Sequence, residues 1–237
     1  MAACLLLVPL MHAGGPLQVA GVSGFNTGLA GTPLTWAQGD VRYYTDQGDL
    51  SPLLSQEQAN ALVADAFQRW TGLTTAALRA TRDGQLDEDV SGSNVVLVSP
   101  GQIDMPADIQ PDAIGKPVAI VYDADGAVTD TLLGEGAGAA DMCDRNAVYG
   151  GPDNFNSDAH LTHALIVLNG NCAQTSAALP DLKYHLIRVL GRVLGLDWTD
   201  LNNNVFTHNP EPTDDDLLGF PVMHALEPAC PASSVCI

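Results

Sequence analysis

Three short apolar runs limit most strongly the folds that this chain can adopt. They are SNVVLVS (93–99), KPVAIVYDADG (116–126) and ALIVLNG (164–170), and each stops at Ser, Pro, Gly or Asp. Apolar runs of this length, bounded by turn residues, predict buried strands. VRYYT (41–45) adds a further predicted strand of aromatic and β-branched residues. The core is therefore expected to be built around a β-sheet.

Two other segments predict helices. In SQEQANALVADAFQRWTG (55–72), Ser55 and Gln58 form a capping box. The apolar residues of this segment recur at helical spacing: Ala59, Leu62, Val63, Ala66, Phe67 and Trp70. The second segment, PDLKYHLIRVLGRVLG (180–195), has Pro180 near its start and a glycine at its end. The order of strand, helix, several strands, helix and loop predicts an α+β domain with an open, twisted mixed sheet and two main helices.

Length and charge bound the organisation of the chain and its partners. With 237 residues and 46% hydrophobic content, the chain can form one large domain with its own core. We expect a leader at 1–13, an extended glycine-rich lead-in at 14–33 and a single domain at 34–237. The leader is too short to span a bilayer, so no membrane insertion is expected. The net charge of −19 argues against nucleic acid and anionic membrane surfaces as partners.

Cysteine usage favours a location outside the cytosol. Cys4 lies in the apolar leader MAACLLLVPLMHA, which has the character of a secretory signal segment. The four remaining cysteines allow three pairings. We favour the nearest-neighbour pairs, Cys143 with Cys172 and Cys230 with Cys236, in a secreted or cell-surface protein. The alternative is four free thiols in a cytosolic protein.

The stretch RVLGRVLGLDW (188–198) has the frame of a zinc-binding helix. Together with PVMHALEP around Met223, and with the first predicted strand and helix, it resembles the matrixin branch of the metzincin zinc proteases over roughly residues 34 to 228. In that family a helix carries H-E-x-x-H-x-x-G-x-x-H, and a methionine further along forms a turn beneath the metal. Gly195 matches the glycine of the motif, and Met223 matches the turn methionine. The resemblance implies a matrixin-like sheet with a Met-turn, and a longer protein in which a further helix and further domains follow this one.

The chain departs from the motif at every chemical position. Arg188 and Arg192 stand at the two helical ligand positions, Val189 at the general-base position and Trp198 at the third ligand position. A guanidinium has no free lone pair for zinc, and valine cannot take a proton from water. The resemblance therefore implies a secreted, catalytically inactive metalloprotease-like domain without zinc. Such a domain would act as a binding or structural module of a larger extracellular protein, with a protein or a glycan as its partner.

The two arginines require acceptors in the former metal cavity. The nearest acids in the sequence are Asp197, Asp200, Asp214, Asp215 and Asp216. Buried charges are usually paired internally, so the leading hypothesis is a salt-bridged plug of arginine and aspartate. An open anion-binding pocket is the alternative.

Histidines elsewhere offer a second possibility, an active secreted zinc metallopeptidase with relocated ligands. Its candidate ligands are His185, His208 and His224. His160 and His163 are expected in a loop that enters a strand. None of these spacings is a recognised zinc pattern, so ordinary polar or core histidines are favoured.

YDADGAVTD (122–130) offers a third possibility, a calcium-stabilised adhesion module. Asp123, Asp125 and Asp130 surround a glycine, and such carboxylates suit a hard cation. The full loop pattern of a calcium site is missing. A plain turn that ends a strand is therefore the favoured interpretation.

Overall fold

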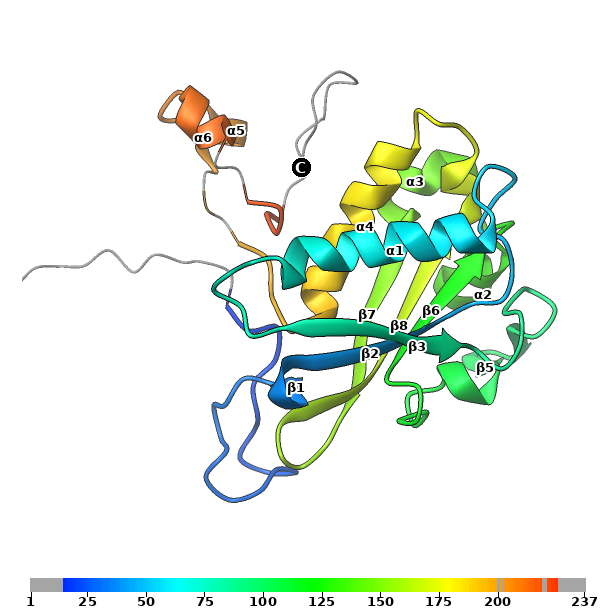
Figure 1. Cartoon of the computed structure of the whole chain (residues 1–237), viewed down its shortest axis with the longest axis horizontal. Helices are drawn as coiled ribbons and strands as arrows, with labels where there is room; N and C mark the ends of the chain where they lie inside the picture. Colours follow the sequence, from blue (N-terminus) through cyan, green and yellow to red (C-terminus); the bar gives the residue numbers. More distant parts are fainter. Residues whose placement is uncertain (1–14, 200, 202, 219–220, 226–237) are drawn as a thin grey trace, which may run out of the picture.

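The computed structural model describes residues 15–199, 201, 203–218 and 221–225. The chain is a mixed α/β protein built on a six-stranded, mostly parallel sheet (Figure 1). The strands of this sheet are β1 (Thr35–Trp36), β2 (Asp40–Thr45), β3 (Arg79–Gln85), β6 (Val118–Asp123), β7 (Val148–Phe155) and β8 (His160–Asn169). Their order is β1-β8-β6-β2-β3, and β7 pairs with β8. The β7–β8 pairing is antiparallel, whereas the other pairings in the sheet are parallel.

Two long helices lie on the same face of this sheet (Figure 1). They are α1 (Gln56–Thr71) and α4 (Leu179–Val193), and they pack on each other and on the sheet around the larger hydrophobic core. The shorter α-helices are α2 (Ala127–Leu133), α3 (Cys143–Asn146), α5 (Asn204–Thr207) and α6 (Asp214–Leu218). Short 3₁₀ turns occur at Ala37–Gly39, Ala107–Ile109, Ala140–Met142 and Gly170–Ala173. A smaller core covers the second face of the sheet, where Val128 of α2 packs near Val121 and Val167.

Both predicted helices are confirmed, with their end signals. The Ser55 hydroxyl accepts a hydrogen bond from the Gln58 backbone N–H at 3.4 Å, and the Gln58 side chain accepts one from the Ser55 N–H at 3.0 Å. Pro180 lies in the first turn of α4, where a missing N–H costs nothing. The segment after α4 was expected to be mostly loop, and it contains the short helices α5 and α6.

The predicted buried strand at 93–99 is wrong in its burial. Within it, β4 (Val96–Ser99) pairs with β5 (Gln102–Asp104) in a separate two-stranded sheet, and its side chains are exposed. Leu97 is 60% exposed, although Ile103 of β5 packs against the smaller core. An apolar run indicates that burial of its side chains would be favourable, but burial also requires another segment that packs on the strand.

The other predicted apolar strands are confirmed as β6 and β8. Strand β8 starts earlier than expected, so His160 and His163 lie in the strand rather than in a loop. Strands β3 and β7 were not predicted, because their sequences are polar or glycine-containing and their pairing is made by the backbone.

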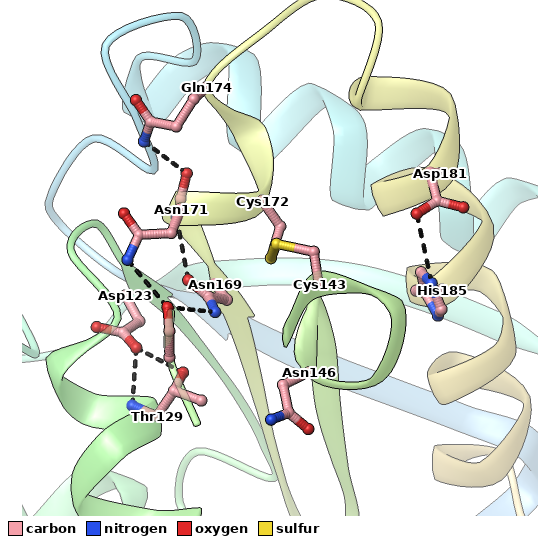
Figure 2. The surroundings of a disulfide bond; sticks show 12 residues. Asp123, Thr129, Cys143, Asn146, Asn169, Asn171, Cys172, Gln174, Asp181 and His185 are labelled. Atoms are coloured by element: carbon pink, nitrogen blue, oxygen red, sulfur yellow. Dashed lines mark hydrogen bonds and ion pairs between the residues drawn. A yellow bond between two sulfur atoms is a disulfide. The ribbon is translucent and has the colours of Figure 1, made fainter. Parts of the chain in front are cut away.

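One hydrogen bond and one disulfide link segments that are far apart in the sequence. The Leu17 N–H donates to the Gly195 carbonyl at 2.7 Å, so the lead-in is held against the turn after α4. The predicted disulfide between Cys143 and Cys172 is confirmed and joins α3 to the 3₁₀ turn that follows β8 (Figure 2). The Cys230–Cys236 pair and the leader lie outside the described residues. No described helix is long and apolar enough to cross a membrane.

Candidate functional site

Arg188, Arg192 and Trp198 meet at the end of α4. The two arginines share a helix face because they are four residues apart. Gly195 has a φ of +90°, a left-handed conformation that turns the chain back after the helix. Trp198 is thereby brought to both guanidinium groups, with its ring centroid 4.8 Å from Arg188 Cζ and 5.3 Å from Arg192 Cζ. Each contact is a cation–π interaction on one shared ring.

Met223 lies against α4 at Gly191. A Cβ built at Gly191 would collide with Met223 Sδ and would lie 2.8 Å from Trp70 Cζ2. The Met223 carbonyl accepts from the Thr199 N–H at 2.9 Å, so the turn is held to the segment that follows Trp198. Gly191 was missed in the sequence analysis. The sequence feature that could have revealed it is a glycine inside a predicted helix, where glycine is normally unfavourable and therefore suggests a close contact.

Arg188 is buried, with 3% of its surface exposed. Its Nη2 donates to the His224 carbonyl at 2.7 Å, and its Cζ lies 5.4 Å from the Tyr184 ring centroid. Burial disfavours the charged form and lowers the pKa of Arg188. The Arg188 guanidinium thus links α4 to the Met223 turn.

Arg192 differs because it is only partly buried. Its Nε is shielded from solvent, and its guanidinium makes no hydrogen bond or ion pair with the described residues. Among the described residues, the expected carboxylate partner is therefore not found for Arg192. Asp197, the nearest candidate, accepts instead from the Trp198 backbone N–H at 2.8 Å. A pairing of either arginine with Asp200 stays a prediction, since Asp200 lies outside the described residues.

The acids Asp214, Asp215 and Asp216 lie in α6, and the described contacts of Asp216 are with Thr213 and Asn204. Asp216 accepts from the Thr213 N–H and hydroxyl, both at 2.8 Å, and from the Asn204 side chain at 3.1 Å. These hydrogen bonds lower the pKa of Asp216, because they favour its charged form. Asp214 and Asp215 are exposed in the first turn of α6.

The structure does not gather the candidate zinc ligands. His185 Nε2 lies 3.6 Å from Asp181 Oδ2, and burial lowers the pKa of His185 (Figure 2). His208 is exposed beside Glu211, and the His224 ring packs on Phe206 at 5.1 Å. In the described part of the chain, no three His, Cys, Asp or Glu side chains form a group that could hold a metal ion.

The three candidate calcium ligands are occupied by hydrogen-bond donors (Figure 2 shows Asp123). Asp123 is 1% exposed and accepts from the Val128 N–H, the Thr129 N–H and the Thr129 hydroxyl. Asp125 accepts from the Ala127 N–H, and Asp130 accepts from the Gly138 N–H. Burial raises the pKa of Asp123. The arrangement agrees with a turn that ends β6 and starts α2.

A pocket of about 370 Å³ opens beside Arg192. It is lined by Leu17 and Gln18 of the lead-in, by residues 149–153 of β7, by Leu165 and by Arg192. Asp153 is partly buried in this wall, and its Oδ1 lies 2.6 Å from Nδ1 of the buried His163. The pocket thus lies between β7 and Arg192, an arrangement that the sequence analysis did not foresee.

The sequence matches no protein-family model and, at a significant level, no curated protein.

Proposed function

We propose that this chain is a secreted or cell-surface domain of matrixin-like fold that has lost zinc and peptidase activity. It serves as a binding or structural module of a larger extracellular protein, with a protein or a glycan as partner. The observation that carries the proposal is the meeting of Arg188, Arg192 and Trp198 on one side of α4, with Met223 packed against the same helix. These are the positions that the zinc motif assigns to three ligands and to the turn methionine.

The chemistry at these positions supports the loss of zinc. Catalytic zinc needs three ligands with free lone pairs and a bound water that a nearby base can activate. Two guanidinium groups donate hydrogen bonds only, and their charge repels a dication. Trp198 also donates only, through its indole N–H. Val189 offers no base.

The disulfide and the charge support the proposed location and class of partner. Cys143 and Cys172 form a bond that persists in oxidising compartments and is rare in the cytosol. The net charge of −19 disfavours nucleic acid.

Restoring the motif tests the proposed fold directly. The variant combines Arg188→His, Val189→Glu, Arg192→His and Trp198→His. We expect it to bind about one zinc ion per chain in metal analysis after dialysis, whereas the natural sequence retains none. The matched control keeps Trp198 and changes the other three positions, and it should bind zinc more weakly because one ligand is missing. A folded fourfold variant without zinc affinity would remove the main support for matrixin-like geometry.

A proteolysis assay tests the loss of activity separately. The purified domain is incubated with an unstructured protein substrate, with and without added zinc. We expect no cleavage in either condition. Cleavage that a chelator abolishes would show an active peptidase and refute the proposal.

A further inference from the structure

Arg192 is a cation that the described chain leaves without an anion. The Arg192 Nε is shielded from solvent and has no hydrogen-bond acceptor among the described residues. The one described contact of the guanidinium charge is the cation–π contact with the Trp198 ring. Charged donors in partly buried positions normally find acceptors, because desolvation without a partner is costly. The guanidinium is therefore available to an acceptor that the described residues do not supply.

The place for that acceptor is the pocket which Arg192 lines. Its volume of about 370 Å³ lies within the range of small-molecule and peptide-end sites. Leu17 and Leu165 give it apolar walls, and residues 149–153 of β7 run along it. The strand β7 pairs with β8 alone in the described sheet, so its second edge is not used by another strand.

The charged side chains around the pocket indicate which kind of ligand it can bind. Arg188 contacts the same indole ring as Arg192 and adds a second positive charge nearby. Asp153 also lines the pocket, but its carboxylate is engaged by His163. The net charge of −19 repels anions at a distance, so a bound anion must gain its affinity at short range. A planar carboxylate can do this, because it accepts two parallel hydrogen bonds from one guanidinium.

We propose that this pocket binds a carboxylate group through Arg192. The carboxylate belongs either to a small organic acid or to the C-terminus of a peptide that extends along β7. The inference deepens the proposed function, since it names the ligand class of a domain whose zinc chemistry is lost.

The test compares three probes on the natural chain by calorimetry. They are N-acetyl-trialanine as the free acid, the same peptide as its C-terminal amide, and sodium acetate. We expect a carboxylate probe to bind and the amide to bind at least about tenfold more weakly than the free acid, because only the acid offers the bidentate acceptor. Arg192→Gln should lower the affinity for the free acid to that of the amide. The matched control, Arg79→Gln on the exposed surface of β3, should leave it unchanged.

The outcomes separate the two sources of the carboxylate. Acetate that binds as tightly as the free-acid peptide identifies a small organic acid, and a much tighter peptide identifies a peptide C-terminus. Equal binding of acid and amide, or binding of neither acid nor acetate, overturns the proposal. The acid and amide are compared on the natural chain, so the result stands even if Arg192→Gln fails to fold. Zinc-dependent cleavage is a separate readout, and its appearance would refute the proposed loss of activity without touching the carboxylate site.

Discussion

Gly191 sets how closely the Met223 turn approaches α4. Glycine inside a helix is unfavourable by about 1 kcal/mol relative to alanine, so its presence needs a structural reason. That reason is the absence of a Cβ, which lets Met223 and the Trp70 ring touch the helix backbone. The Trp70 ring has little room to move, because its Nε1–H donates to the Ile187 carbonyl at 2.9 Å.

Gly191→Ala is therefore expected to destabilise the fold by about 1–3 kcal/mol, the usual cost of overpacking a core. Urea denaturation measures this change in the free energy of unfolding. Gly115→Ala is the matched control, since a Cβ at Gly115 meets no atom within 4 Å. A Gly191→Ala variant as stable as the control would mean that Met223 does not pack as described.

Asp46 is a buried carboxyl group whose titration should shape the pH dependence of stability. Its Oδ1 accepts from the Gln47 and Val90 N–H groups, and its Oδ2 accepts from the Tyr122 N–H. Burial outweighs these three hydrogen bonds and raises the pKa of Asp46 from 3.8 to about 6. The folded state then holds this proton more tightly than the unfolded state. The stabilisation from Asp46 is thus fully present below its unfolded pKa and is lost as the pH rises through about 6.

Asp46→Asn should accordingly flatten the pH dependence of the free energy of unfolding between about pH 4 and 7. The natural chain should become more stable as the pH falls through this range, once the contributions shared with the variant are subtracted. Urea denaturation at a series of pH values measures the difference. Asp141→Asn, at an exposed position outside this network, is the control. Parallel curves for the natural chain and Asp46→Asn would contradict the prediction.

At the scale of elements, the two long helices and the hairpin β4–β5 show what a sequence pattern can and cannot specify. The apolar period of α1 matches its buried face, with Ala59, Val63 and Phe67 turned to the core. Strand β4 is equally apolar but remains exposed, whereas Val95 just before it is buried. A helix carries its own periodicity, whereas the burial of a strand depends on which other segments cover it.

The disulfide is the element-scale feature with the largest expected effect. Cys143 and Cys172 are 29 residues apart in the sequence, so their bond closes a substantial loop in the unfolded chain. Replacing both by serine should lower the free energy of unfolding by about 3–4 kcal/mol, because the unfolded chain regains the conformational entropy of the opened loop. Urea denaturation of Cys143→Ser/Cys172→Ser measures the loss. Peptide mapping without reductant that finds free thiols at both positions would show that the bond does not form.

On the scale of the whole molecule, charge is the dominant property. A net charge of −19 destabilises the compact state through self-repulsion, and salt screens that repulsion. We expect the urea midpoint to rise between about 0.05 and 0.5 M sodium chloride, by a modest amount. Calcium chloride at equal ionic strength should give a similar rise, because Asp123, Asp125 and Asp130 are occupied by N–H and hydroxyl donors. A much larger rise with calcium would reveal a calcium site and favour the adhesion module.

The sequence by itself determined the features that depend on neighbouring residues. It placed the capping box at Ser55, the helical face of α1 and the strand β6, since each follows from local spacing and turn chemistry. It also placed Arg188 and Arg192 on one helix face, because that relation needs only the helical period. The nearest-neighbour disulfide followed from counting cysteines and choosing the shortest loops.

Only the tertiary structure decided which residues from distant segments meet. The pairing of β7 with β8 brings Asp153 to the pocket, and the return of the chain at Gly195 brings Trp198 to the two arginines. Asp197, the acid nearest to Arg192 in the sequence, accepts from a backbone N–H instead, because proximity in sequence does not fix where a carboxylate points. Local patterns encode the elements, while contacts between elements depend on how the whole core packs.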